Sequence, residues 1–184
     1  MLILLSLCAC SADEPTGERI RAQYSDMTAA SATVKILSDI DRSALEYQGE
    51  FQYNKNGEDR LTMTAPEETA GIEILIGGEQ TNALTLRYEG TELFLELDTP
   101  SGTRPVDAAS ALMQTLQTAE PTAIGSDLLD GVTAYHVSYH EPDSDPAVSR
   151  EVWLDANGLP LCAEVFVDGE KRVTLLFTDF TTAP

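Results

Sequence analysis

The sequence predicts a mainly β fold of about ten antiparallel strands with two flanking helices. Three observations point to this fold class. Apolar and polar residues alternate with a period of two in many segments, short turn signals separate those segments, and only two stretches have helical spacing. The links between the alternating segments are very short, which excludes the crossovers of a parallel nucleotide-binding sheet.

Two helices are expected. The first spans residues 17–27 and places Ile20, Tyr24 and Met27 on one face. The second spans residues 105–117, where Pro105 can open a helix and Pro121 follows its end. Its apolar face consists of Val106, Ala109, Met113 and Leu116, with Leu112 beside them.

Nine segments have the alternation typical of half-buried strands. They are residues 45–53, 61–65, 72–76, 84–88, 93–97, 135–139, 148–154, 161–167 and 173–177. Asn56-Gly57 and Asp168-Gly169 are pairs that favour tight type I′ hairpins, because both central residues of such a turn need positive φ. Gly77-Gly78 and Gly90-Thr91 mark two further reversals.

The charge balance excludes some functions. The chain has 184 residues, with 31 Asp and Glu against 11 Lys and Arg, and a formal net charge of −20. Nucleic-acid binding needs clustered basic residues, so no nucleic-acid partner is expected. The same negative field disfavours electrostatic docking to anionic lipids. A hydrophobic content of 42% is that of a folded chain, and this length predicts one domain.

The N-terminus predicts a lipid anchor. Residues 1–9 form an uncharged apolar run that is too short to span a membrane. Leu7-Cys8-Ala9-Cys10 resembles a bacterial lipobox, which implies a signal peptide at 1–9, lipidation of Cys10, a tether at 10–17 and a domain at 18–184. Two acyl chains on Cys10 would hold the protein stably on the extracytoplasmic face of a bacterial cell membrane. The alternative is a buried N-terminal strand with two chance cysteines.

The sequence offers little catalytic chemistry. His136 and His140 lie about 13 Å apart in a strand, too far to share a zinc ion, and are expected to face solvent. Cys162 has no base placed to activate it and is expected to be a buried, inert thiol. Residues 143–145 and 155–158 match only parts of a calcium loop. We therefore expect no enzyme activity, no metal and no cofactor.

The C-terminal third resembles the ending of the LolA-like lipoprotein carrier superfamily. The likeness lies in residues 151–161, Asp168-Gly169 and residues 177–180, and it extends to residues 49–55 and Arg60-Leu61. It implies a curved, incomplete antiparallel barrel with helices covering the concave face, and a hollow that holds acyl chains. Relatives that are themselves lipoproteins include envelope glycolipid carriers and germination lipoproteins of spore formers, which act as partners of a cell-wall hydrolase.

Two functions remain open on this basis. In the first, a lipid or a lipoprotein acyl chain binds in an apolar hollow between the sheet and a helix lid. The candidate lining residues are Phe51, Tyr53, Met63, Ile74, Leu86, Leu95, Val106, Met113, Leu116, Val137, Val165 and Leu175. In the second, the hollow is filled and the acidic surface docks an envelope or spore-wall protein such as a cell-wall hydrolase. A cavity above about 300 Å³ would favour the first.

Overall fold

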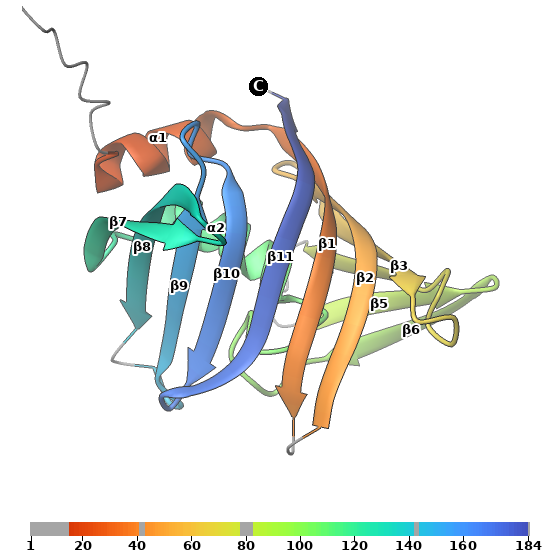
Figure 1. Ribbon diagram of the computed structural model, residues 1–184. Coiled ribbons are helices and arrows are strands. Elements are labelled where there is room, and N and C mark those ends of the chain that lie inside the picture. The colour runs from red at the N-terminus through yellow and green to blue at the C-terminus, as the bar shows by residue number, and fades with distance from the viewer. Residues whose placement is uncertain (1–14, 41–42, 78–82, 142–143, 184) are drawn as a thin grey trace, which may run out of the picture.

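The computed structural model describes residues 15–40, 43–77, 83–141 and 144–183. Within them, eleven strands form one antiparallel sheet in the order β6-β5-β4-β3-β2-β1-β11-β10-β9-β8-β7. Figure 1 shows this sheet curving around α2 without closing into a barrel. The predicted fold class, a mainly β half-barrel with helices, is confirmed.

The elements follow one another along the chain as α1, β1 to β6, α2 and β7 to β11. The helices are α1 (Gly17–Asp26) and α2 (Ala108–Thr118). The strands are β1 (Ala29–Ile40), β2 (Ser43–Asn54), β3 (Glu58–Ala65), β4 (Glu73–Gly77), β5 (Ala83–Tyr88), β6 (Thr91–Glu96), β7 (Ala123–Leu129), β8 (Val132–Glu141), β9 (Val148–Leu154), β10 (Pro160–Val167) and β11 (Glu170–Ala183). The strands β1 and β7 are not among the nine alternating segments.

The first and last strands join two meanders at the centre of the sheet. Strand β1 pairs with β2 on one side and with β11 on the other, and the pairs include Val34 with Gly49 and Val34 with Phe177. Consecutive strands pair on either side of this centre, and β6 and β7 form the two edges. The concave face therefore has two halves, β2 to β6 and β11 to β7, which meet at β1.

The first helix closes one end of the half-barrel. Thr16 caps its N-terminus, because the Thr16 hydroxyl accepts a hydrogen bond from the Arg19 backbone N–H at 3.2 Å. Ile20, Tyr24 and Met27 are all buried, which confirms the predicted apolar face. The Tyr24 hydroxyl donates to the Gly158 carbonyl at 2.8 Å and so ties α1 to the turn between β9 and β10 (Figure 1).

The second helix begins three residues later than predicted. The Arg104 backbone N–H donates to Asp107 Oδ1 at 3.2 Å, so the Asp107 side chain closes a turn that includes Pro105. The helix starts directly after this turn, at Ala108, and ends at Thr118. It packs against α1 and the centre of the sheet, with contacts to β2 and β11.

Of the two predicted type I′ hairpin turns, the structure has one and lacks the other. Asp168 and Gly169 have φ values of 51° and 79°, as a tight turn of this kind requires. The prediction of a type I′ turn at Asn56-Gly57 is wrong, because neither residue has a positive φ. There the Asn54 side chain accepts from the Asn56 backbone N–H at 3.2 Å, and the Gly57 N–H donates to the Asn54 carbonyl at 3.1 Å. The asparagine side chain stabilises the turn in place of a left-handed backbone.

Candidate ligand cavity on the concave face

A row of apolar side chains crosses the concave face from the core to one edge of the sheet. Phe51 pairs with Leu61, Leu61 with Ile74, Ile74 with Leu86, and Leu86 with Leu93. Burial falls along this row: Phe51, Leu61 and Ile74 are buried, Leu86 is half-buried, and Leu93 on β6 is 53% exposed. The helices thus cover the start of the row and leave its end open.

A cavity of about 250 Å³ lies in the covered part of this half of the sheet. Its wall is almost wholly apolar. The lining residues are Ile36, Tyr47, Leu61, Met63, Thr69, Ile72, Ile74, Leu86, Pro105 and Val106. The strands β1 to β5 supply most of the wall, and Pro105 and Val106 border it from the segment before α2. The volume is below the value of about 300 Å³ that would favour the ligand-binding function, and below the range of about 300–1,000 Å³ usual for small-molecule sites, so the cavity has room for at most one apolar chain.

Four of the twelve candidate lining residues lie at this cavity: Met63, Ile74, Leu86 and Val106. The others lie elsewhere, and seven of them are buried in the core: Phe51, Tyr53, Met113, Leu116, Val137, Val165 and Leu175. Leu95 packs against the core and is partly buried, and Tyr53 borders a different depression. Ligand contact at any of the twelve stays a prediction.

Six lining residues were not among the candidates. Ile72 and Leu61 belong to alternating segments of the sequence, and Ile36 lies between Lys35 and the apolar Leu37. Tyr47 also lies in an alternating segment. Thr69 and Pro105 carry no such signal, because they lie in irregular segments that only the folded chain brings to the cavity.

The helix α2 has the environment of a core element. Eight of its eleven residues are buried, and Met113 and Leu116 are 1% and 0% exposed. The Gln117 side chain amide donates to the Tyr53 hydroxyl on β2, which fixes the C-terminal half of the helix to the sheet. The part of this region that borders the cavity is the preceding segment, at Pro105 and Val106.

A buried arginine holds the segment that leads to α2. Arg150 on β9 is 4% exposed; its guanidinium bonds to the Glu141 carboxylate and donates to the Ser101 carbonyl at 3.0 Å. Asp107 is also buried and pairs with Arg104 at 3.5 Å. Burial raises the pKa of Asp107, and the nearby Arg104 charge opposes that rise. These ion pairs fix the approach to the cavity from the α2 side.

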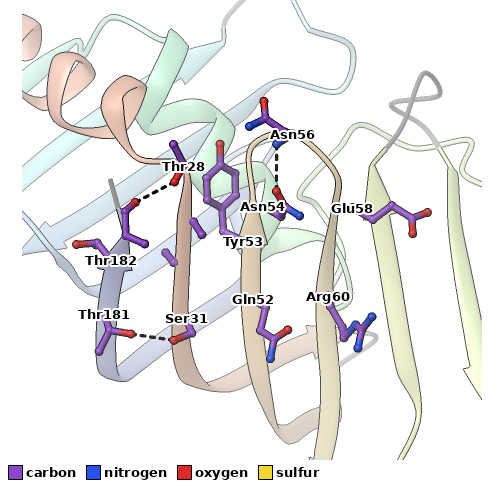
Figure 2. Close-up of a pocket in the computed structure, with 13 residues that line it drawn as sticks. Thr28, Ser31, Gln52, Tyr53, Asn54, Asn56, Glu58, Arg60, Thr181 and Thr182 are labelled. Carbon is purple, nitrogen blue, oxygen red and sulfur yellow. Dashed lines mark hydrogen bonds between the residues drawn. The ribbon is translucent and has the colours of Figure 1, made fainter.

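A second depression, of about 600 Å³, lies at the ends of β1, β2, β3 and β11. Figure 2 shows its polar side chains, including Ser31 and Thr181, whose hydroxyls are 2.8 Å apart. Its wall combines uncharged polar residues with Glu58 and Arg60. Such a surface does not suit an acyl chain, because burying those polar groups against hydrocarbon would leave their hydrogen bonds unmade.

The surroundings of the two histidines and of Cys162 suit structural rather than catalytic side chains. His136 is half-buried rather than fully solvent-facing: its ring stacks on Trp153 with centroids 4.6 Å apart, and its Nε2 lies 2.8 Å from Glu151 Oε2. His140 is exposed, as predicted. Burial is the largest cause that raises the pKa of Cys162 to about 11. Its thiol is therefore protonated at neutral pH, which agrees with an inert side chain.

The predicted lipid anchor lies outside the described residues, and the described residues contain neither a metal-binding cluster nor a membrane-spanning helix. Cys10 and the predicted signal peptide precede the first described residue, Pro15. From residue 15 to residue 183, apart from the gaps, no cluster of three or more His, Cys, Asp or Glu side chains has an arrangement suited to a metal ion. None of the helices in this part of the chain has the length and apolar character of a membrane span.

No protein-family model and no curated protein matches the sequence. Solved structures with a similar fold cover most of it. An uncharacterized conserved protein from Thermus thermophilus is 13% identical with a TM-score of 0.53, and the match covers 91% of this chain and 85% of that chain. A LolA superfamily protein from Nitrosomonas europaea is 13% identical with a TM-score of 0.44 and coverage of 92% and 94%.

A chain in the structure of the CwlD amidase from Clostridioides difficile in complex with the GerS lipoprotein is 18% identical. Its TM-score is 0.48, and the match covers 89% of this chain and 92% of that chain. At these identities the comparisons concern the fold. The fold, one curved antiparallel sheet that does not close into a barrel, is the architecture that the resemblance of the sequence implies, and the Thermus thermophilus protein shares it.

Proposed function

We propose that this protein is a non-enzymatic, lipid-anchored envelope protein that binds one acyl chain in the cavity on the concave face. The observation that carries the proposal is the wall of that cavity, in which only Thr69 and the Tyr47 hydroxyl are polar. Transfer of each methylene of a hydrocarbon chain from water to such a site gains about 0.8 kcal/mol. A cavity of about 250 Å³ limits the ligand to one chain or part of one.

The open end of the apolar row supports the same proposal. A chain that enters the cavity at Ile74 and Leu86 can continue along the concave face over Leu93, which is exposed in the free protein. Chains longer than the cavity would then cover Leu93. The ligand is therefore a single-chain lipid, or one acyl chain of a larger lipid or of a lipoprotein.

The binding test uses a neutral single-chain probe, a pyrene-labelled monoacylglycerol, with the full chain. Leu86→Glu places a carboxyl group in the cavity wall and should weaken probe binding at least tenfold, because the ligand would have to desolvate the charge. Leu128→Glu is the matched control, since Leu128 is 68% exposed on the other half of the sheet. Equal affinity of wild type and Leu86→Glu would contradict the proposed site.

The anchor is proposed from the Leu7-Cys8-Ala9-Cys10 pattern. Lipidation of Cys10 would hold the domain at the extracytoplasmic face of the cell membrane, close to a source of acyl chains. Cys10→Ala should move the protein to the soluble fraction or leave an uncleaved precursor, whereas Cys8→Ala should not. A processed, membrane-bound Cys10→Ala variant would contradict the anchor.

A second function, docking of another envelope or spore-wall protein, is favoured by a different observation. The edge strand β6 carries exposed apolar side chains, Leu93 and Phe94, in strongly acidic surroundings. A free monomeric surface rarely combines these features without a partner. This function does not require an occupied cavity.

A further inference from the structure

The outer edge of β6 is free for backbone pairing. Strand β6 pairs with β5 over its whole length, from Tyr88 opposite Thr91 to Ala83 opposite Glu96. Among the described residues, no backbone hydrogen bond joins its other side to any segment. Figure 1 shows β6 at the margin of the sheet. Such an edge presents a row of N–H and C=O groups that can accept another strand.

This edge carries large apolar side chains on both of its faces. Leu93 lies on the concave face opposite Leu86, and Phe94 lies on the convex face opposite Thr85. Phe94 is 56% exposed and takes no part in the cavity wall. The β6 sequence contains neither of the residues that most often protect an edge, Pro and Lys.

The charge around β6 selects against a second copy of this chain. Glu89, Glu92, Glu96 and Asp98 flank the edge, and the Arg87 guanidinium already bonds to Glu92 at 2.6 Å. Antiparallel pairing of β6 with itself, centred on Phe94, would place Glu92 opposite Glu96 of the other copy at two positions. Like charges opposite each other across strands destabilise the pair. A basic strand would instead meet opposite charges.

We propose that the outer edge of β6 binds an extended, basic segment of another protein, which adds a twelfth strand to the sheet. Backbone hydrogen bonds would provide the affinity, lysine or arginine side chains would pair with Glu92 and Glu96, and apolar side chains would cover Leu93 and Phe94. The site deepens the second function above by naming its surface and partner chemistry. It differs from the acyl-chain site at Phe94, which faces away from the cavity, whereas Leu93 would also contact an acyl chain that extends beyond the cavity.

The test measures binding of a heptapeptide of alternating lysine and valine to the full chain. The control is the same peptide with every backbone nitrogen methylated, which keeps the charge but removes the hydrogen-bond donors. The unmethylated peptide should bind at least tenfold more tightly than the methylated one and should slow amide hydrogen exchange in β6 at least tenfold. Equal binding of the two peptides would overturn the proposal, because it would show charge attraction alone.

A pair of variants locates the site. Phe94→Thr should weaken peptide binding at least fivefold, and Leu128→Thr, which removes another exposed apolar side chain at the other end of the sheet, should leave it unchanged. Equal losses in the two variants would overturn the β6 site. Self-association of the wild-type chain through protected β6 amides would also overturn it, because the occupant would then be a second copy. The monoacylglycerol probe should bind Phe94→Thr as it binds wild type, so failure of one proposal is distinct from failure of the other.

Discussion

Leu86 and Leu93 lie opposite each other on the concave face of β5 and β6, yet Leu86 lines the cavity and Leu93 is 53% exposed. An acyl chain that fills the cavity and continues past Leu86 would bury Leu93. The dependence of affinity on Leu93 should therefore increase with chain length. Leu93→Lys should weaken binding of a 16-carbon monoacylglycerol at least threefold and leave an 8-carbon one nearly unchanged, as titrations of both lipids would show. An equal loss for the two would mean that the chain does not extend over β6.

Met113 tests whether α2 is a core helix. Its side chain is 1% exposed among core residues, so Met113→Asp should destabilise the whole domain by about 3–5 kcal/mol through burial of an unpaired charge. Gln114→Asp is the control on the same helix, because Gln114 is exposed and the change should cost less than about 1 kcal/mol. Chemical denaturation measures both. Retention of wild-type stability by Met113→Asp would show that α2 opens as a lid.

Tyr24 links α1 to the β9–β10 turn, and its loss should be measurable. Tyr24→Phe removes the bond to the Gly158 carbonyl and should lower the free energy of unfolding by about 1 kcal/mol. Tyr88→Phe, at an exposed position, should change it by less than about 0.5 kcal/mol. Equal unfolding midpoints for wild type and Tyr24→Phe would contradict a stabilising role for this hydrogen bond.

The same tyrosine predicts a loss of stability at alkaline pH. Burial is the first cause that raises the pKa of Tyr24 above 10.0, and the charges of Tyr139 and Asp155 raise it further. The folded state therefore keeps a proton that the unfolded state loses, so the free energy of unfolding falls as pH rises above 10. Tyr24→Phe should show a smaller fall between pH 9 and pH 11. An identical slope would assign the alkaline loss to other groups, of which Tyr139 is the first to test.

Cys162 should react slowly in the folded protein. With a pKa of about 11 against an ordinary value of 9.0, the thiolate fraction at pH 8 is about a hundredfold lower than in the unfolded chain. Alkylation by iodoacetamide, measured in a Cys8→Ala/Cys10→Ala variant, should be at least a hundredfold faster in denaturant than in buffer. Comparable rates would show that the thiol is accessible and ionised.

The strands that the sequence predicts are those whose alternation is strict and whose ends carry turn residues. In β2, Leu45, Tyr47, Phe51 and Tyr53 alternate with polar residues and all point to the concave side. Strand β1 was not identified although Val34 and Ile36 alternate with Thr33 and Lys35, because no Gly or Pro separates it from α1. Strand β7 is an edge with one face in solvent, and Gly125 interrupts its pattern.

The site was predicted less well than the fold. Alternation shows which residues share a face but not which face is concave; the structure puts Met63, Ile74 and Leu86 in the wall of the cavity. Alternation also does not show which part of the concave face the helices fill. Val106 lies at the cavity rather than in the helix, because the Arg104–Asp107 turn precedes the start of α2. The ion pair of Arg150 with Glu141, which lies near this segment, joins two different strands. Contacts of this kind have no local signal.

The central claim is that the cavity at Leu86 holds a single acyl chain, and native mass spectrometry of the full chain tests it most directly. The protein, gently extracted from the membrane of the cells that produce it, should carry a noncovalent mass of one single-chain lipid or one acylated molecule per chain. Leu86→Glu should lack this mass, and Leu128→Glu should retain it. A wild-type protein without bound lipid, or a Leu86→Glu variant with the same lipid as wild type, would contradict the claim.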